Sequence, residues 1–129
     1  MKSLTEVIKE VRVIEKQVQY IPAVLYRVYE SNELIYIGIG GIGNRKASGR
    51  LREHYKATMP SSFKNKILWR EIRKNGRNNG LNGEEMADAA EAVWNSLGWC
   101  YEIGTKDDIK MKEKELIKEY QPKYNIEFK

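Results

Sequence analysis

The sequence predicts an α+β domain in which a small antiparallel sheet of about three strands is flanked by helices, with an extra helix at the N-terminus. Two segments rich in β-branched and aromatic residues, 23–29 and 34–37, are separated by a short polar stretch, a pattern typical of a β-hairpin. Residues 99–103 alternate in polarity and predict a third strand. The chain of 129 residues, 41% of them hydrophobic, has the length of one domain.

Apolar residues that recur at helical spacing predict the other elements. They indicate helices over residues 4–16, 46–58, 61–75, 83–97 and 106–119. Ser3 and Glu6 form a capping box before the first helix. That helix belongs to an N-terminal extension of residues 1–21, whereas residues 22–129 form the main domain. A glycine-rich loop over residues 38–43 is expected to follow the second strand.

Composition limits location and partners. No run approaches the ~18 consecutive apolar residues of a membrane-spanning helix, and the N-terminus does not resemble a signal peptide, so we expect a cytoplasmic protein without a membrane partner. A single Cys100 gives no disulfide framework and no zinc site. The net charge is +5, with acids clustered in 84–91 and bases in 45–56 and 64–77. This segregation predicts one positive face and permits a polyanionic partner.

The glycine-rich loop matches the dinucleotide pattern GxGxxG, but a nucleotide cofactor is not expected. A dinucleotide site needs a parallel βαβ unit with an acidic residue ~20 positions further on, where this chain has Phe63 within a predicted helix. No Lys-Ser or Lys-Thr follows the glycines, which excludes a P-loop. The loop is interpreted as a turn with positive φ angles, or as a backbone approach to a phosphate.

Glu113 is the candidate metal ligand. At about 100° per residue, it falls within the apolar stripe of its helix, between Ile109 and Ile117. A buried carboxylate is costly without a partner, so we expect a cation or a strong donor beside it. The alternative is a carboxylate that reaches water or pairs with a lysine. Magnesium suits a single carboxylate because it keeps most of its waters and takes further ligands from phosphates.

Arg50 and His54 are four residues apart and therefore share a helix face. Leu51 and Tyr55 are expected to point inward, toward the core. A guanidinium matches the oxygens of a phosphate, and a histidine can donate or relay protons to a leaving oxygen. The alternative is a solvated basic face.

Tyr26 and Tyr36 lie ten residues apart across the predicted hairpin. Because strand side chains alternate, a two-residue turn at Ser31 and Asn32 would place them on opposite faces, whereas an odd-numbered connection places them together. We predict the odd-numbered loop. A tyrosine at such a site could act as a base if a nearby cation lowered its pKa from about 10. Packing in the core is the alternative.

Further basic residues are candidates for contacts with nucleic-acid phosphates. Four of them follow one helix face at i, i+4, i+7 and i+11, and two more follow the glycine-rich loop. They are Lys66, Arg70, Arg73 and Arg77, and Arg45 and Lys46. Such residues give affinity without sequence information. A solvated charged face is the alternative.

The order of these residues resembles the GIY-YIG nuclease superfamily over nearly the whole chain. Val24–Tyr26 stands where the GIY triplet would be, and Tyr36–Gly38 is a full YIG triplet. Arg50–His54 resembles the helix that carries the catalytic arginine and, in many members, a histidine four residues on. Glu113, followed by Asn125 after twelve residues, is similar to the metal-binding glutamate and the terminal asparagine of the family.

The resemblance implies a role for each candidate. Glu113 would hold one Mg²⁺ (or Mn²⁺), Arg50 would grip the scissile phosphate, and Tyr26 would accept the proton of the attacking water. Tyr36 and His54 would assist, and Asn125 would orient its neighbours.

Two positions depart from the family pattern. Val24 stands where the family has the glycine of GIY, and Ile39 stands where many members have a lysine after YIG. Arg45 or Lys46 would supply that positive charge instead.

The sequence thus predicts a divalent-metal-dependent DNA endonuclease that hydrolyses phosphodiester bonds. It resembles a stand-alone nuclease of restriction, mobile-element or phage kind, because longer family members append recognition domains. Cutting both strands with one site per chain favours a homodimer or higher homo-oligomer, formed through the helix at 4–16. The alternative is a DNA-binding module that keeps the fold without cleavage.

Overall fold

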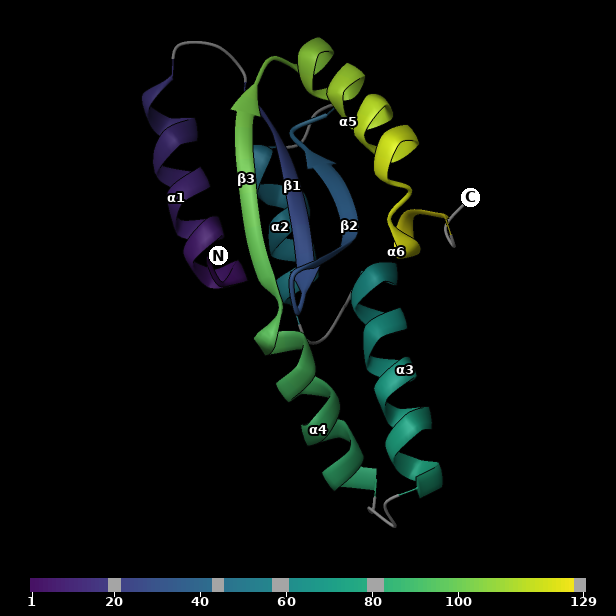
Figure 1. Ribbon diagram of the computed structural model, residues 1–129. Helices are drawn as coiled ribbons and strands as arrows, with labels where there is room; N and C mark the ends of the chain where they lie inside the picture. Colours follow the sequence, from purple (N-terminus) through teal and green to yellow (C-terminus); the bar gives the residue numbers. More distant parts are fainter. Residues whose placement is uncertain (19–21, 43–45, 57–60, 79–82, 127–129) are drawn as a thin grey trace.

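Three antiparallel strands form the sheet in the computed structural model of the chain, which describes residues 1–18, 22–42, 46–56, 61–78 and 83–126 (Figure 1). The strands are β1 (Ala23–Glu30), β2 (Glu33–Gly40) and β3 (Gly98–Gly104), in the order β2-β1-β3. The helices are α1 (Leu4–Gln17), α2 (Ala47–Tyr55), α3 (Ser62–Asn78), α4 (Gly83–Ser96), α5 (Lys106–Tyr120) and α6 (Lys123–Ile126). The predicted α+β class, with a three-stranded antiparallel sheet, flanking helices and an N-terminal helix, is confirmed.

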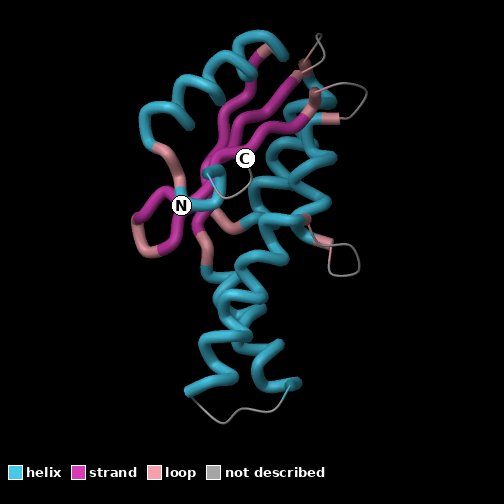
Figure 2. Tube along the Cα trace, turned by 90° about the vertical axis from the view of Figure 1, so that its right-hand side faces the viewer, coloured by secondary structure: helices cyan, strands magenta, loops and turns pink. Residues whose placement is uncertain are grey.

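Helices cover both faces of the sheet, as Figure 2 shows. One face carries Tyr26 and Trp99 and packs on α1 and α2 in the larger core, where Leu51 is fully buried. The other face carries Leu25 and packs on Ile109 of α5 in a smaller core. The helices α3 and α4 pack against each other and extend beyond one end of the sheet. No helix in the described part of the chain is long and apolar enough to cross a membrane.

The N-terminal helix α1 is part of the larger core. Its predicted capping box at Ser3 is present, and Val7 and Val11 are fully buried. Near its other end, the Glu15 carboxylate accepts hydrogen bonds from the backbone N–H and the hydroxyl of Ser48, at 3.2 and 2.9 Å. These donors lie in the first turn of α2, where backbone N–H groups have no partner within the helix. The apolar face of α1 is therefore used within the chain, and its carboxylate caps a second helix.

The hairpin turn differs from the predicted odd-numbered loop. Two residues, Ser31 and Asn32, connect β1 and β2, and both have positive φ angles of 49° and 70°. Two consecutive residues with positive φ are typical of the tight turns that suit the twist of a hairpin. The prediction of an odd-numbered connection is therefore wrong.

A β-bulge nevertheless brings the two candidate tyrosines to one face of the sheet. Near the turn, Tyr29 lies opposite Leu34. One residue further from the turn, Val28 lies opposite Tyr36 and not opposite Ile35. Ile35 is thus the extra residue of the bulge. A shift of one residue reverses the facing of every later side chain. Tyr36 therefore points to the same face of the sheet as its partner Val28. Tyr26, two residues before Val28 on β1, points to that face as well.

Some element boundaries also differ from the predictions. The glycine-rich segment does not begin as a loop, because β2 continues through Gly40 and the positive φ angle of 80° falls at Gly41. Gly43, the last glycine of that segment, lies outside the described residues. The helix α3 continues to Asn78, three residues beyond the predicted end. The short helix α6 was not predicted.

Gly38 makes room for the ring of Tyr26, its partner across the two strands. A Cβ atom at Gly38 would lie 2.4 Å from both Cζ and Oη of Tyr26, far closer than carbon atoms pack. The ring cannot withdraw easily, because Tyr26 is fully buried and also contacts Trp99, with ring centroids 5.8 Å apart. A glycine at this position therefore lets the tyrosine lie across β2.

We expect Gly38→Ala to lower the free energy of unfolding by about 1–3 kcal/mol, the range for an overpacked core, as measured by urea denaturation. Gly83→Ala is the matched control, because a Cβ atom there meets nothing within 4 Å, and it should change stability by less than about 0.5 kcal/mol. In a Tyr26→Ala background, Gly38→Ala should cost clearly less. An equal cost in both backgrounds would show that the ring is not the cause.

Candidate active site

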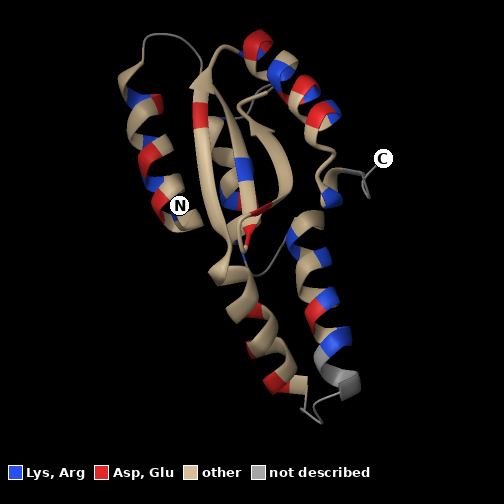
Figure 3. Ribbon diagram, in the orientation of Figure 1, with Lys and Arg blue, Asp and Glu red and all other residues tan. Residues whose placement is uncertain are grey.

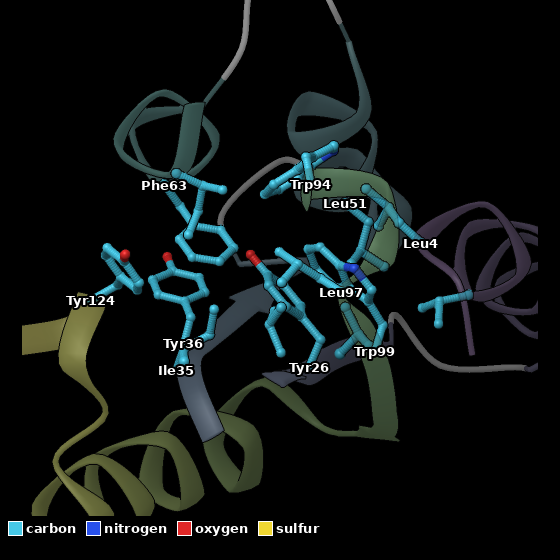
Figure 4. Close-up of a cluster of buried hydrophobic side chains, with 14 of the residues drawn as sticks. Leu4, Tyr26, Ile35, Tyr36, Leu51, Phe63, Trp94, Leu97, Trp99 and Tyr124 are labelled. Atoms are coloured by element: carbon cyan, nitrogen blue, oxygen red, sulfur yellow. The ribbon is translucent and has the colours of Figure 1, made fainter. Parts of the chain in front are cut away.

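Aromatic side chains from β1, β2 and α3 form the floor of the candidate site (Figure 4). The ring centroids of Tyr26 and Tyr36 lie 6.3 Å apart, and Figure 4 shows both hydroxyl groups on the same side of the sheet. The Tyr36 ring stacks on Phe63, with centroids 4.2 Å apart and an angle of 10° between the planes. The two tyrosines are therefore held rigidly, and Phe63 is a supporting residue that the sequence did not single out.

His54 lies inside the core rather than on a solvated face. It is fully buried, and its Nε2 atom lies 2.7 Å from the hydroxyl oxygen of Tyr26. Its Nδ1 atom lies 2.5 Å from the hydroxyl oxygen of Ser61. Tyr55, which was expected to point inward, is 58% exposed, so that prediction is wrong. The helix α2 is rotated so that Leu51 and His54, not Leu51 and Tyr55, face the sheet.

The hydrogen bonds around His54 are compatible with both neutral tautomers. With the proton on Nδ1, that nitrogen donates to the Ser61 oxygen, and Nε2 accepts from the O–H of Tyr26. With the proton on Nε2, both directions are reversed, and Ser61 donates to Nδ1 while its oxygen accepts from the backbone N–H of Lys64 at 3.1 Å. Ser61 was predicted only as a possible start of α3. Its contact with His54 joins residues seven apart and could not be read from local sequence.

Burial controls the protonation of these groups. It lowers the pKa of His54 to about 3, and the positive charge of Arg50 adds to this effect. It raises the pKa of Tyr26 well above the ordinary value of 10.0, and raises that of Tyr36 as well. Arg50 opposes both increases through its charge and hydrogen bonding. At neutral pH, His54 is uncharged and both phenols keep their protons, so neither tyrosine has the lowered pKa that a simple base would need.

Arg50 lies beside both tyrosines and is oriented by its own helix. One terminal nitrogen donates to a carboxylate oxygen of Glu53 at 2.8 Å. The guanidinium also influences the Tyr26 and Tyr36 hydroxyls through charge and hydrogen bonding. Because a guanidinium has five N–H donors in a rigid plane, one ion pair fixes its orientation and leaves donors for a phosphate. Glu53 is thus a further site residue that the sequence analysis did not identify.

Glu113 lies on the helix that covers the other side of the sheet and influences the tyrosines through its charge. It lies on α5, which runs beside the edge strand β2 (Figure 1). Its charge acts on the hydroxyls of both Tyr26 and Tyr36. Burial raises the pKa of the Glu113 carboxyl above its ordinary value of 4.5, and Lys114 offsets only part of that increase. The carboxylate is therefore half-buried, as its position in the apolar stripe predicted.

Asn125 binds the backbone of the edge strand instead of projecting into the site. Its side-chain oxygen accepts from the N–H of Ile37 at 2.8 Å, and its NH₂ group donates to the C=O of Ile37 at 2.7 Å. The amide thus imitates one residue of a neighbouring strand and pairs two groups that β2 would otherwise leave open. This fixes α6 against β2, next to Tyr36.

The basic residues predicted to contact phosphates differ in their exposure to solvent. Lys46 is exposed at the start of α2, Arg73 is exposed on α3, and Lys66 is half-buried there. Figure 3 shows mainly Lys and Arg along α3, with one acidic residue among them, and Asp and Glu along α4, whereas α1 and α5 carry both signs. Arg45 lies outside the described residues, and the side chain of Arg77 is outside them as well. The predicted segregation of charge therefore holds between α3 and α4 only.

Arg70 has internal partners. Its two terminal nitrogens donate to the two carboxylate oxygens of Glu30 at 3.0 and 2.7 Å, and one of them also donates to the hydroxyl of Tyr124 at 2.8 Å. A forked pair of this kind is among the strongest charge-assisted contacts. Arg70 therefore ties α3 to the hairpin and to α6, which leaves less of its charge for an external phosphate.

Within the described ranges, no three His, Cys, Asp or Glu side chains come together as a metal cage. Comparisons of the chain with models of protein families, with curated protein sequences and with solved structures find no match. The functional argument therefore depends on the geometry of the site itself.

The buried neutral His54 predicts a specific loss of stability in acid. The pKa of His54 is about 3 in the folded chain against 6.5 ordinarily, so the unfolded chain takes up the proton first as the pH falls. The contribution of His54 is complete above about pH 6.5 and declines toward pH 3, by up to about 1.4 kcal/mol per pH unit. The difference in free energy of unfolding between wild type and His54→Gln should shrink accordingly from pH 7 to pH 4.5.

Since the chain has one histidine, the carboxylates titrate alike in both proteins and cancel in this difference. Urea denaturation at several pH values measures it. A difference that stays constant over this range would contradict a buried, neutral His54.

Proposed function

We propose that the chain is a divalent-metal-dependent DNA endonuclease of the GIY-YIG type, which hydrolyses phosphodiester bonds. One observation carries the proposal: polar side chains of two helices, α2 and α5, act on the hydroxyls of two tyrosines that come from β1 and β2. Arg50 acts on both by charge and hydrogen bonding, Glu113 acts on both by charge, and His54 binds Tyr26 directly. A core that needed only apolar packing would have no use for this set of charged groups.

Arg50 is suited to hold the scissile phosphate. Its planar guanidinium matches two phosphate oxygens, and the ion pair with Glu53 fixes its plane before substrate arrives. Developing negative charge on a phosphate in the transition state is stabilised most by donors that need no rearrangement. We therefore assign to Arg50 the binding and polarisation of the phosphate, with Glu53 as its positioning residue.

The hydrogen-bonded pair Tyr26–His54 is suited to move a proton. The raised pKa of Tyr26 means that its oxygen can accept a proton from water only if its own proton leaves at the same time. In the tautomer that carries its proton on Nδ1, Nε2 of His54, 2.7 Å away, is positioned to receive it. Tyr26 would then act as a relay, and His54 would be a transient acceptor, because its pKa is about 3. In this tautomer the hydrogen bond from His54 to Ser61 would keep the ring in the correct orientation.

Glu113 is the residue that would hold the cation. Its half-buried carboxyl has a raised pKa because Lys114 compensates only part of the effect of burial, which fits an anionic group that a cation would stabilise. A single carboxylate is enough for Mg²⁺ or Mn²⁺, which take their other ligands from water and phosphate oxygens. Such an ion, when bound, would supply positive charge at the phosphate. Each chain contributes one site of this kind, so cleavage of both strands would take two copies.

Supercoiled-plasmid cleavage in the presence of Mg²⁺ or Mn²⁺ tests the proposal. Glu113→Gln should reduce the rate by about 100-fold or more, because the amide keeps the shape of the side chain but loses its charge. Glu115→Gln is the matched control, since Glu115 is exposed on the same helix, and it should cleave like wild type. DNA binding in EDTA should be similar for all three proteins.

Cleavage that Glu113→Gln leaves unchanged would place the active site elsewhere. A wild-type protein that binds DNA but nicks it with no divalent ion would instead be a DNA-binding module with this fold.

A further inference from the structure

Trp69 lies exposed in a basic groove beside the candidate active site. The groove, of about 560 Å³, runs between α3 and α6. Of the described residues that line it, four are basic and none is acidic. Trp69 is 57% exposed, whereas Trp94 and Trp99 are 4% and 1% exposed. The indole ring of Trp69 is therefore open to solvent among the cationic side chains that line the groove.

We propose that this groove binds a single-stranded segment of DNA flanking the scissile phosphate, with an unpaired base stacked on Trp69. In a duplex, the faces of the bases are covered by their neighbours, so a protein ring can stack only on a base that is unpaired or displaced. Aromatic rings beside a basic groove are the usual means by which proteins bind single strands. Lys66, Arg73 and Lys123 would contact the phosphates.

The groove is placed to continue a strand from the candidate site, and in this respect the inference rests on the proposed function. The Tyr36 ring stacks on Phe63 at 4.2 Å between centroids, and Phe63 contacts Tyr124 at 5.7 Å. Tyr124 in turn lines the groove. At about 3.4 Å of helix axis per nucleotide in one strand, these two steps correspond to a few nucleotides. Asn125 holds α6, one wall of the groove, against β2.

Charge distinguishes this occupant from a second copy of the chain. A copy could offer the acidic residues of α4, but two chains that each carry a net charge of +5 repel one another. A single DNA strand offers a planar π face and regularly spaced negative charges in one molecule. Arg70 lies in the same wall but is paired with Glu30, so it is not needed for the argument.

Binding of a labelled oligothymidylate of about 15 nucleotides, measured by fluorescence anisotropy in EDTA, tests the inference. Trp69→Leu should weaken this binding by about 5- to 150-fold, and Trp69→Phe, which keeps a ring, should weaken it much less. Affinity for a blunt duplex of the same length should change little in both variants. DNA should also quench the tryptophan fluorescence of the wild type, because the exposed indole is the one it can reach.

The outcomes separate this inference from the proposed function. If wild type cleaves plasmid but Trp69→Leu binds the oligothymidylate normally, the inference fails and the nuclease proposal stands. If wild type never cleaves yet Trp69→Leu loses single-strand binding, the nuclease proposal fails and the groove is confirmed. If Trp69→Leu turns a dimer into a monomer in sedimentation while single-strand binding is unchanged, the groove is an interface between copies and the inference is overturned.

A cleavage substrate completes the test. A duplex with an unpaired tail next to the cutting region should be cleaved faster than a blunt duplex by wild type, and Trp69→Leu should lose this preference. Equal preference in both proteins would show that the groove takes no part in substrate choice.

Discussion

The extra residue in β2 decides which side chains meet at the candidate site. Without the bulge at Ile35, the two-residue turn would send Tyr36 to the face covered by α5. With it, Tyr36 joins Tyr26 on the face that receives α2, so that Arg50 and His54 meet both phenols. Gly38 then allows the Tyr26 ring to lie across β2, toward the strand edge that α5 flanks. The bulge at Ile35 and the missing side chain at Gly38 therefore allow residues of α2 and α5 to act on the same two tyrosines.

The polar groups at this point are buried but satisfied, which explains why the arrangement is stable. In the described part of the chain, every buried side-chain nitrogen and oxygen has a hydrogen-bond partner. A buried histidine without partners would be costly, yet His54 has one on each ring nitrogen. Asn125 similarly occupies both backbone groups of Ile37 on the open edge of the sheet. The same hydrogen bonds that stabilise the core therefore fix the position of the candidate catalytic groups.

The sequence predicted the positions of helices and strands better than it predicted which side chains of each element point into the core. Periodicity and capping residues located the five longer helices and three strands, because these signals are local. The register of the hairpin and the rotation of α2 depend on long-range packing, so the odd-numbered loop and an inward Tyr55 were wrong. Ser61, Glu53 and Phe63 were missed for the same reason, since their partners are known only once the chain is folded. Glu113 was found because a carboxylate in an apolar stripe contradicts the local pattern, and such contradictions often mark functional positions.

The electrostatics of the site support the proposal for a cation more strongly than any motif. Burial makes negative charge unfavourable at three neighbouring groups at once, since the pKa values of Tyr26, Tyr36 and Glu113 are all raised. Arg50 is the nearby positive charge, and Glu53 already offsets part of it. A bound phosphodiester would add a further negative charge beside these groups, and its hydrolysis would increase that charge in the transition state. The protein groups alone leave this charge poorly compensated, so binding of the substrate and of a cation beside Glu113 should each favour the other.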